Sequence, residues 1–190
     1  RITWRDGVIV APEAEAEQEE AGAGGPSVAA FRGNVQVVSP EMKLTHADEM
    51  RLRFTEGETG SSSIDAIDAT GSVRAHSVGE EGEIACEQLH VDIVEGEAGQ
   101  ALPRRMEADG GIRIADANQK MWAESLIVTF TEMTDEETAE PGRPADRPGE
   151  FANARVAVDT VEAEGDVQVR PAGGERVFAD RLVAQAAGET

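Results

Sequence analysis

The chain lacks most of the residues on which catalysis and nucleic-acid binding depend. Its 190 residues include no tyrosine, one cysteine, three histidines and two lysines, and aromatic residues make up 4% of the whole. A single cysteine excludes an internal disulfide bond. The 38 acidic residues outnumber the 17 basic ones and give a formal net charge of −21. Because such a chain repels a phosphate backbone, its composition argues against a nucleic-acid partner.

Long apolar runs and catalytic motifs are also missing. No run approaches the roughly 18 apolar residues of a membrane-spanning helix, so we expect no transmembrane segment. The sequence has no Gly-x-Ser-x-Gly, phosphate-binding loop or dinucleotide fingerprint. His46, His76 and His90 do not stand at metal-binding spacing from another histidine, cysteine or acid. We therefore expect no enzyme, catalytic residue, metal or cofactor, and we expect Cys86 to be a small buried residue.

What the sequence does contain is a repeated motif. Four residues precede a glycine in this motif: an apolar residue, a residue that is usually an acid, a residue that is usually alanine, and a residue of any type. Polar residues that alternate with Val or Ile follow the glycine. The copies are Ala29–Gly33, Ile67–Gly71, Met106–Gly110 and Val161–Gly165. Each is followed, after 14, 15, 13 and 14 residues from its glycine, by a small residue and an acid: Ala47-Asp48, Cys86-Glu87, Ala123-Glu124 and Ala179-Asp180. Such regular spacing predicts a stack of similar units.

Between these signatures, apolar residues alternate with polar ones. This period of two is typical of strands with one apolar and one wet face, so we predict an all-β, antiparallel fold with an aliphatic interior. The residues predicted to face that interior are Val35, Val37, Met50, Leu52, Phe54, Val73, Leu89, Val91, Ile93, Ile112, Ile114, Leu126, Val128, Phe130, Val167, Val169 and Leu182.

The repeats organise the chain into one domain over residues 1–190. We predict a partial hairpin at 1–10, repeat units at about 28–60, 61–100, 101–132 and 151–190, and mobile insertions at 11–27 and 133–150. The insertions are acidic and rich in Gly, Ala or Pro, and cannot bury enough apolar surface to order themselves. We expect the strands on either side of each insertion to pair directly.

The repeated glycine predicts a bend or bulge, where the chain passes from one sheet layer to the other. Two bent layers would enclose an apolar interior along the stacking direction. If the layers close tightly, the interior is an ordinary sandwich core. If one side stays open, the interior is a groove that accepts acyl chains. Composition alone leaves both possibilities open.

Two copies of the motif resemble a known family. The segments Phe31–Val37 and Leu44–Met50, and likewise Glu164–Val169 and Phe178–Leu182, are similar to the OstA-like family of periplasmic lipopolysaccharide-transport proteins, which includes LptA and LptC. Its pattern is a glycine, Asn-Val-x-Val, and later Leu-x-Ala-Asp-x-Leu. The second copy departs from it at Ser72 and Cys86-Glu87, and the third at Gly111 and Ala123-Glu124.

The resemblance implies a repeated β-jelly-roll, or "β-taco", whose seventeen inner residues above line a site for acyl chains. It also implies a periplasmic bridge component that carries lipopolysaccharide or a related glycolipid towards the outer membrane. Its partners would be that lipid and other bridge components, or further copies of the chain, joined by edge-strand addition. A start at Arg1 without methionine predicts a processed chain or part of a longer envelope protein. The alternatives are an AsmA/TamB-like phospholipid-transfer groove and a purely structural β-solenoid of an envelope or cell-surface assembly.

Overall fold

The described part of the protein consists almost entirely of β-strands. The computed structural model describes residues 2–4, 7–17, 27–38, 42–56, 62–77, 82–96, 101–132 and 156–185. The strands within those residues are β1 (Ile2–Trp4), β2 (Gly7–Val10), β3 (Glu13–Glu17), β4 (Ser27–Arg32), β5 (Gln36–Val38), β6 (Met42–His46), β7 (Glu49–Glu56), β8 (Ser62–Ser77), β9 (Glu83–Glu95), β10 (Ala101–Ala115), β11 (Gln119–Glu132), β12 (Val156–Pro171) and β13 (Val177–Gln185). The prediction of an all-β chain is confirmed.

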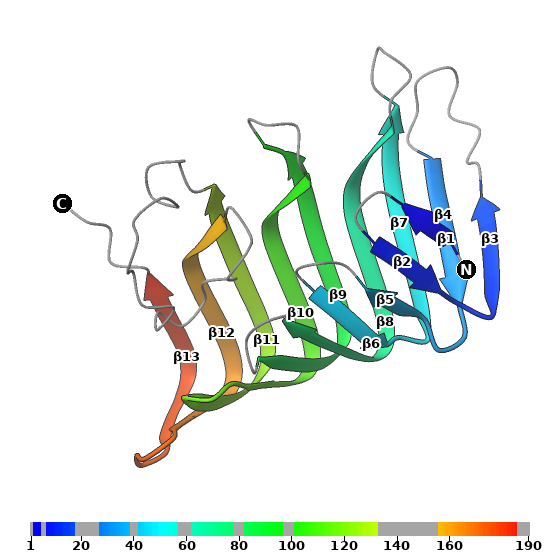
Figure 1. Cartoon of the computed structure of the whole chain (residues 1–190). Helices are drawn as coiled ribbons and strands as arrows, with labels where there is room; N and C mark the ends of the chain where they lie inside the picture. Colours follow the sequence, from blue (N-terminus) through cyan, green and yellow to red (C-terminus); the bar gives the residue numbers. More distant parts are fainter. Residues whose placement is uncertain are drawn as a thin grey trace.

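All these strands belong to one antiparallel sheet that does not close on itself. Its order is β1-β2-β5-β6-β8-β9-β10-β11-β12-β13, and β3, β4 and β7 branch off in sequence from β8. The branch arises because β8 pairs with β7 before its glycine and with β6 after it. Figure 1 shows the long strands curving, so that the sheet folds into two arms. The upper arm contains β3, β4, β7 and the part of β8 before Gly71, and the lower arm contains β1, β2, β5, β6 and the part of β8 after Gly71. The other long strands continue both arms in the same way.

Glycine bulges produce this bend at the same place in every unit. Gly33, Gly71, Gly110 and Gly165 have φ angles of 76°, 79°, 82° and 80°. Each is followed by a second residue with positive φ: Asn34, Ser72, Gly111 and Asp166. Strand register shifts there, for example between Thr70 and Val73 of β8. Positive φ is costly for residues with a Cβ atom, which explains the repeated glycine. The predicted bulge is confirmed.

The acid that follows the small residue of each unit lies over the glycine of the next unit. A Cβ atom added to Gly71 would lie 2.6 Å from the Cβ of Asp48, and one added to Gly165 would lie 2.6 Å from the Cβ of Glu124. Gly110 faces Glu87 in the same way, at 2.7 Å. These glycines are thus required twice, because the backbone angle and the close approach both exclude a side chain.

A second irregularity accompanies the first. Asp65, Arg104 and Asp159 each lie six residues before a motif glycine, and each is skipped in the pairing with a neighbouring strand. Such bulges increase local twist, so each long strand bends at two places. The sequence patterns did not reveal this second bulge, since Asp65, Arg104 and Asp159 share only a charged side chain, and charged residues make up 29% of the chain.

The structure bears on both predicted insertions. The mobile insertion predicted at 11–27 is wrong over residues 13–17, because they form β3 and pair with β4. Ala11 packs against the core and Pro12 lies beside Gly33. The segment from β2 to β3 therefore corresponds to the strands that carry a small residue and an acid in the other units, with Pro12 in the place of the acid. The insertion predicted at 133–150 lies outside the described residues. The strands that flank it, β11 and β12, pair directly as expected. The same expectation is wrong for the first insertion, because β2 pairs with β1 and β5 whereas β4 pairs with β3 and β7.

Candidate functional site: the apolar inner face

The inner face is one apolar cluster that runs through every unit from Ile9 to Leu182 and includes residues of both arms. Ten of the seventeen residues predicted to line it are buried, at 8% exposure or less: Val35, Val37, Met50, Leu52, Val73, Leu89, Ile112, Leu126, Val128 and Val167. Most of these residues stand two positions after a motif glycine or after the acid that follows the small residue, such as Val35 after Gly33 and Met50 after Asp48. They pack against one another where the two arms meet and hold the arms together.

The remaining predicted residues are half-buried: Phe54, Val91, Ile93, Ile114, Phe130, Val169 and Leu182. All of them except Leu182 stand four or six positions beyond a glycine or acid of the bend, and Leu182 stands two positions beyond Asp180 on the edge strand β13. Along β11, for example, Leu126 is 1% exposed and Val128 is 6% exposed, whereas Phe130 is half-buried. All of the half-buried set except Ile93 pack on the core cluster. The outer part of the inner face therefore keeps apolar surface that a ligand could cover, and the part at the bend does not.

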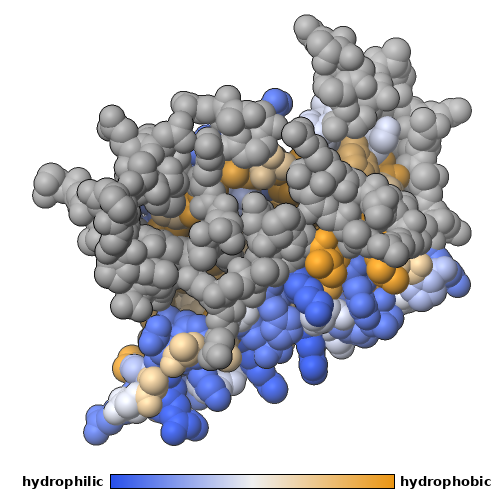
Figure 2. Space-filling view, in the orientation of Figure 1, coloured by the Kyte–Doolittle hydropathy of each residue, from blue (hydrophilic) through white to orange (hydrophobic). Residues whose placement is uncertain are grey.

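Polar groups are absent from the buried part of this face. Among the described residues, no polar or charged side chain is buried. Figure 2 shows apolar side chains on the inner side of the fold and polar ones over the outer face of the lower arm. Binding on the inner face would thus rest on burial of apolar surface, without a charged group to fix a ligand's orientation.

Several inner residues were missed by sequence reasoning. Phe31, Ala69, Ala108 and Ala163 stand two positions before the motif glycines, and each is 3% exposed or less. Their signal was present in the motif itself, whose third residue is usually alanine. Alanine stands at this position in three units and Phe31 in the first. Ile9 and Leu44, each 2% exposed, precede the small-residue signature on the lower arm.

Cys86 is buried, as predicted, and occupies the place that alanine has in other units. Burial, together with the nearby charge of Asp109, raises the pKa of the Cys86 thiol to about 11, against a smaller opposing effect of a backbone hydrogen bond from Gln88. The thiolate, which is the reactive form, is therefore scarce at neutral pH.

We expect Cys86 to be inert towards a thiol reagent in the native protein. Ellman's reagent at pH 7.5 should label less than about one tenth of the thiol within an hour, and all of it in guanidinium chloride, because unfolding exposes the side chain. The absorbance at 412 nm measures this directly. Rapid labelling of the folded protein would show that Cys86 is accessible.

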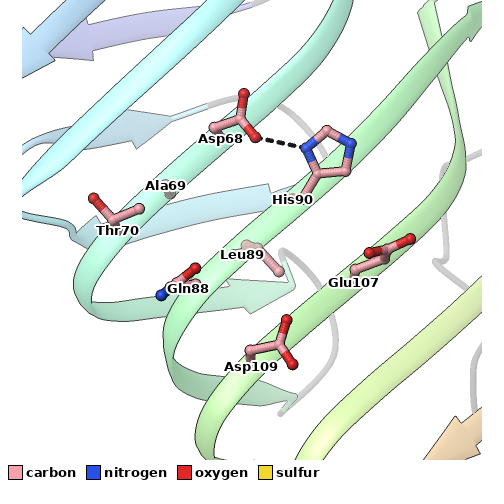
Figure 3. Close-up of a pocket in the computed structure, with 8 residues that line it drawn as sticks. All are labelled: Asp68, Ala69, Thr70, Gln88, Leu89, His90, Glu107 and Asp109. Carbon is pink, nitrogen blue, oxygen red and sulfur yellow. Dashed lines mark hydrogen bonds and ion pairs between the residues drawn. The ribbon is translucent and has the colours of Figure 1, made fainter.

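The outer face carries a polar depression across β8, β9 and β10, shown in Figure 3. Its lining residues are Asp68, Ala69, Thr70, Gln88, Leu89, His90, Glu107 and Asp109. The His90 ring lies between two carboxylates, with Nδ1 2.6 Å from Asp68 and Nε2 3.1 Å from Asp92. Burial alone would lower the pKa of His90, but the hydrogen bonds and charges of Asp68 and Asp92 outweigh it, so this pKa is raised.

This raised pKa has a consequence for stability. Because the folded state binds the proton more tightly, the contribution of His90 is fully present below its ordinary pKa of 6.5 and is lost as the pH rises through the raised value. Half-exposed ion pairs contribute less than about 1 kcal/mol. The unfolding free energy of the wild type should therefore exceed that of Asp68→Asn by more at pH 5.5 than at pH 8.5. Urea titrations at both pH values measure the difference, and an equal or larger difference at pH 8.5 would contradict it.

The described residues contain no group of three His, Cys, Asp or Glu residues placed to hold a metal ion. In the same residues there is no helix with the length and hydropathy needed to traverse a bilayer.

The comparisons with known proteins leave the family open. No protein-family model matches the chain, and no curated protein matches it.

The last strand of the order presents apolar side chains to solvent. On β13, Val177 is 56% exposed, Phe178 is 66% exposed and Val183 is 53% exposed. The strand pairs with β12 on one edge, and no described strand pairs with its other edge. Figure 1 shows β13 at the opposite end of the sheet from β1 and β3.

Proposed function

We propose that the protein carries the acyl chains of lipopolysaccharide or a related glycolipid along its inner face, as one component of a periplasmic bridge of the OstA-like kind. The observation that supports this most strongly is the continuous apolar cluster that runs through every unit and keeps half-buried apolar residues away from the bend. On this proposal, the bent sheet is the β-taco of that family, and the acyl chains lie between its two arms.

The physics of such a face suits transport. Covering hydrocarbon is favourable by about 0.8 kcal/mol per CH₂ group, and the interaction has no preferred direction. A lipid tail that moves from Ile114 to Phe130 exchanges one apolar contact for another of the same kind. With no buried polar side chain among the described residues, there is little to hold the tail at one place. A uniform track of this type permits sliding.

The charge of the chain sets a condition on the head group. A net charge of −21 repels an anionic glycolipid at long range. Screening confines that repulsion to about 8 Å at physiological salt, and divalent cations reduce it further. The head group therefore lies outside the arms, in water and among counter-ions, while only the tails enter.

Photo-crosslinking on adjacent residues of β10 tests this proposal. Ile114 is half-buried on the inner face, whereas its neighbour Arg113 is exposed on the outer face. A diazirine amino acid at position 114 should crosslink to purified lipopolysaccharide, and the same group at position 113 should not. Crosslinks to phospholipid alone would instead support the phospholipid-transfer alternative. Equal yields at both positions, or none at either, would contradict acyl-chain binding between the arms.

A further inference from the structure

The outer face of the lower arm has a charge opposite to that of the chain as a whole. Exposed cations stand there at positions that alternate with core residues such as Val73 and Ile112. They are Lys43 on β6, Arg74 on β8, Arg113 on β10, Lys120 on β11 and Arg170 on β12. Beyond the bend, Glu83 on β9 is the only acid in the lower-arm strands that the structure describes. This face is therefore basic, in a chain with 17 basic and 38 acidic residues.

Strand register places these cations in two rows that cross the strands. In the row nearer the bend, Arg74 and Arg113 pair with Ala85 of β9 from its two sides. In the second row, Lys120 pairs with Arg170 across β11 and β12. Because neighbouring strands lie about 4.8 Å apart, cations on β6 to β12 extend over roughly 24 Å. Both rows run along the stacking direction, parallel to the inner face.

These cations keep their charge available for an external anion. None of the five forms an ion pair with the residues that the structure describes. Lys120 and Arg170 even lie directly opposite one another, an arrangement of like charges that destabilises a sheet. On the outer face of the upper arm, by contrast, cations lie 2.7–3.6 Å from a glutamate oxygen: Arg32, Arg51, Arg105 and Arg181.

Apolar side chains share this basic face. Trp122 pairs with Arg113 and is half-buried, so part of its indole ring remains exposed. At one end of the rows, Val38 pairs with Lys43 and is 46% exposed. At the other end, the exposed Phe178 lies in the same row as Trp122, because Gln168 pairs with both. Lysine and arginine together with tryptophan, phenylalanine and aliphatic residues are typical of surfaces that lie on a lipid bilayer.

We infer that the outer face of the lower arm docks on an anionic phospholipid bilayer. Its cations lie against the lipid phosphates, and Trp122, Val38 and Phe178 enter the boundary between head groups and acyl chains. A soluble polyanion would account for the cations alone. Because both rows run along the stack, the inner face then lies parallel to the membrane surface. This docking does not depend on whether the inner face binds lipid.

Acids at the bend limit the contact. Glu87, Glu124 and Asp166 each stand two residues from the nearer row, which is about 7 Å along the strand. This distance is within the screening length of about 8 Å at physiological salt, so these acids oppose the approach of an anionic surface. The bend is therefore tilted away from the bilayer, and the contact is reversible at high salt.

Vesicle co-sedimentation of the full chain tests this docking. At low salt, the wild type should partition at least tenfold more strongly onto vesicles of about one third phosphatidylglycerol in phosphatidylcholine than onto phosphatidylcholine alone. Each cation near an anionic surface strengthens binding roughly fivefold. Arg113→Glu combined with Lys120→Glu should therefore lower the partition coefficient at least tenfold. No partition of the wild type onto the anionic vesicles would overturn the inference.

Two control variants separate the basic face from other causes. Arg51→Glu combined with Arg53→Glu changes the net charge equally on the outer face of the upper arm, and should lower the partition coefficient less than about threefold. Equal losses for the two double variants would show that net charge decides binding. Phe130→Asp, on the inner face, should partition like the wild type, and its failure to bind would place the vesicle contact between the arms.

A second copy of the chain is the competing partner, because it is itself strongly acidic. Sedimentation velocity at low salt, without vesicles, separates the two cases. The wild type and the Arg113→Glu, Lys120→Glu variant should sediment alike. Self-association of the wild type that this variant abolishes, in the absence of vesicle binding, would assign the basic face to a second copy and overturn docking on a bilayer.

Discussion

Gly110→Ala should destabilise the protein by about 3 kcal/mol, whereas Gly111→Ala, one residue along the same bulge, should cost about 1 kcal/mol. Both residues have positive φ, at 82° and 58°. The difference lies in the space around them. A Cβ at Gly110 would lie 2.7 Å from the Cβ of Glu87, whereas a Cβ at Gly111 meets nothing within 4 Å. Other units already carry Asn34, Ser72 and Asp166 in the place of Gly111.

Urea denaturation of the two variants measures this difference, and a double-mutant cycle identifies its cause. If the collision with Glu87 is responsible, then Glu87→Gly should restore part of the stability of Gly110→Ala, with a coupling of at least about 1 kcal/mol. Equal losses for the two alanine variants would mean that backbone strain alone explains the repeated glycine. In that case the contact between acid and glycine would be incidental.

Leu126→Ala should cost about 2–5 kcal/mol, and Leu182→Ala should cost clearly less, about 1 kcal/mol. The two leucines stand two positions after the acid of their unit and belong to the same inner face. Leu126 is 1% exposed between paired strands, and Leu182 is half-buried on the edge strand β13. The larger loss follows because a cavity at Leu126 is enclosed on all sides, whereas the site at Leu182 opens to solvent.

Thermal and urea unfolding of both leucine variants give the comparison with a single kind of substitution. The result matters for function, because it separates residues that hold the arms together from residues that have surface left for a ligand. Similar losses at the two positions would show that β13 is as well covered as the inner strands. The free edge would then be occupied, contrary to the account above.

Much of this fold follows from the sequence, because its two main determinants are local. Alternation assigns each strand an inner face, and the residues predicted to lie on it are indeed buried or half-buried. The repeated glycine marks the bend, since few other residues adopt positive φ. The sequence left open whether each glycine ends a strand or bends it. The structure has continuous strands such as β8, β10 and β12, because a bulge changes direction without breaking the pairing.

What sequence could not provide depends on contacts between units. The sequence shows that an acid recurs after the small residue of each unit, but it does not show why. The structure gives the reason, because each such acid contacts the glycine of the next unit. The strand β3 was missed because Glu13–Glu17 alternates alanine with glutamate, which is no strand signal by itself. It is ordered by pairing with β4. The degree of burial along the inner face could not be predicted either. Leu126 and Phe130 point to the same face of β11, but Leu126 is buried and Phe130 is half-buried.

The most direct test of acyl-chain binding is mass spectrometry of organic extracts from the purified protein. Wild-type protein isolated from a Gram-negative periplasm without detergent should contain lipopolysaccharide or a related glycolipid in at least a tenth of the molecules. Phe130→Asp should contain at least tenfold less while keeping a cooperative unfolding transition, because Phe130 lies on the half-buried part of the inner face. Wild-type protein free of any lipid, or equal lipid content in the two proteins, would contradict the account.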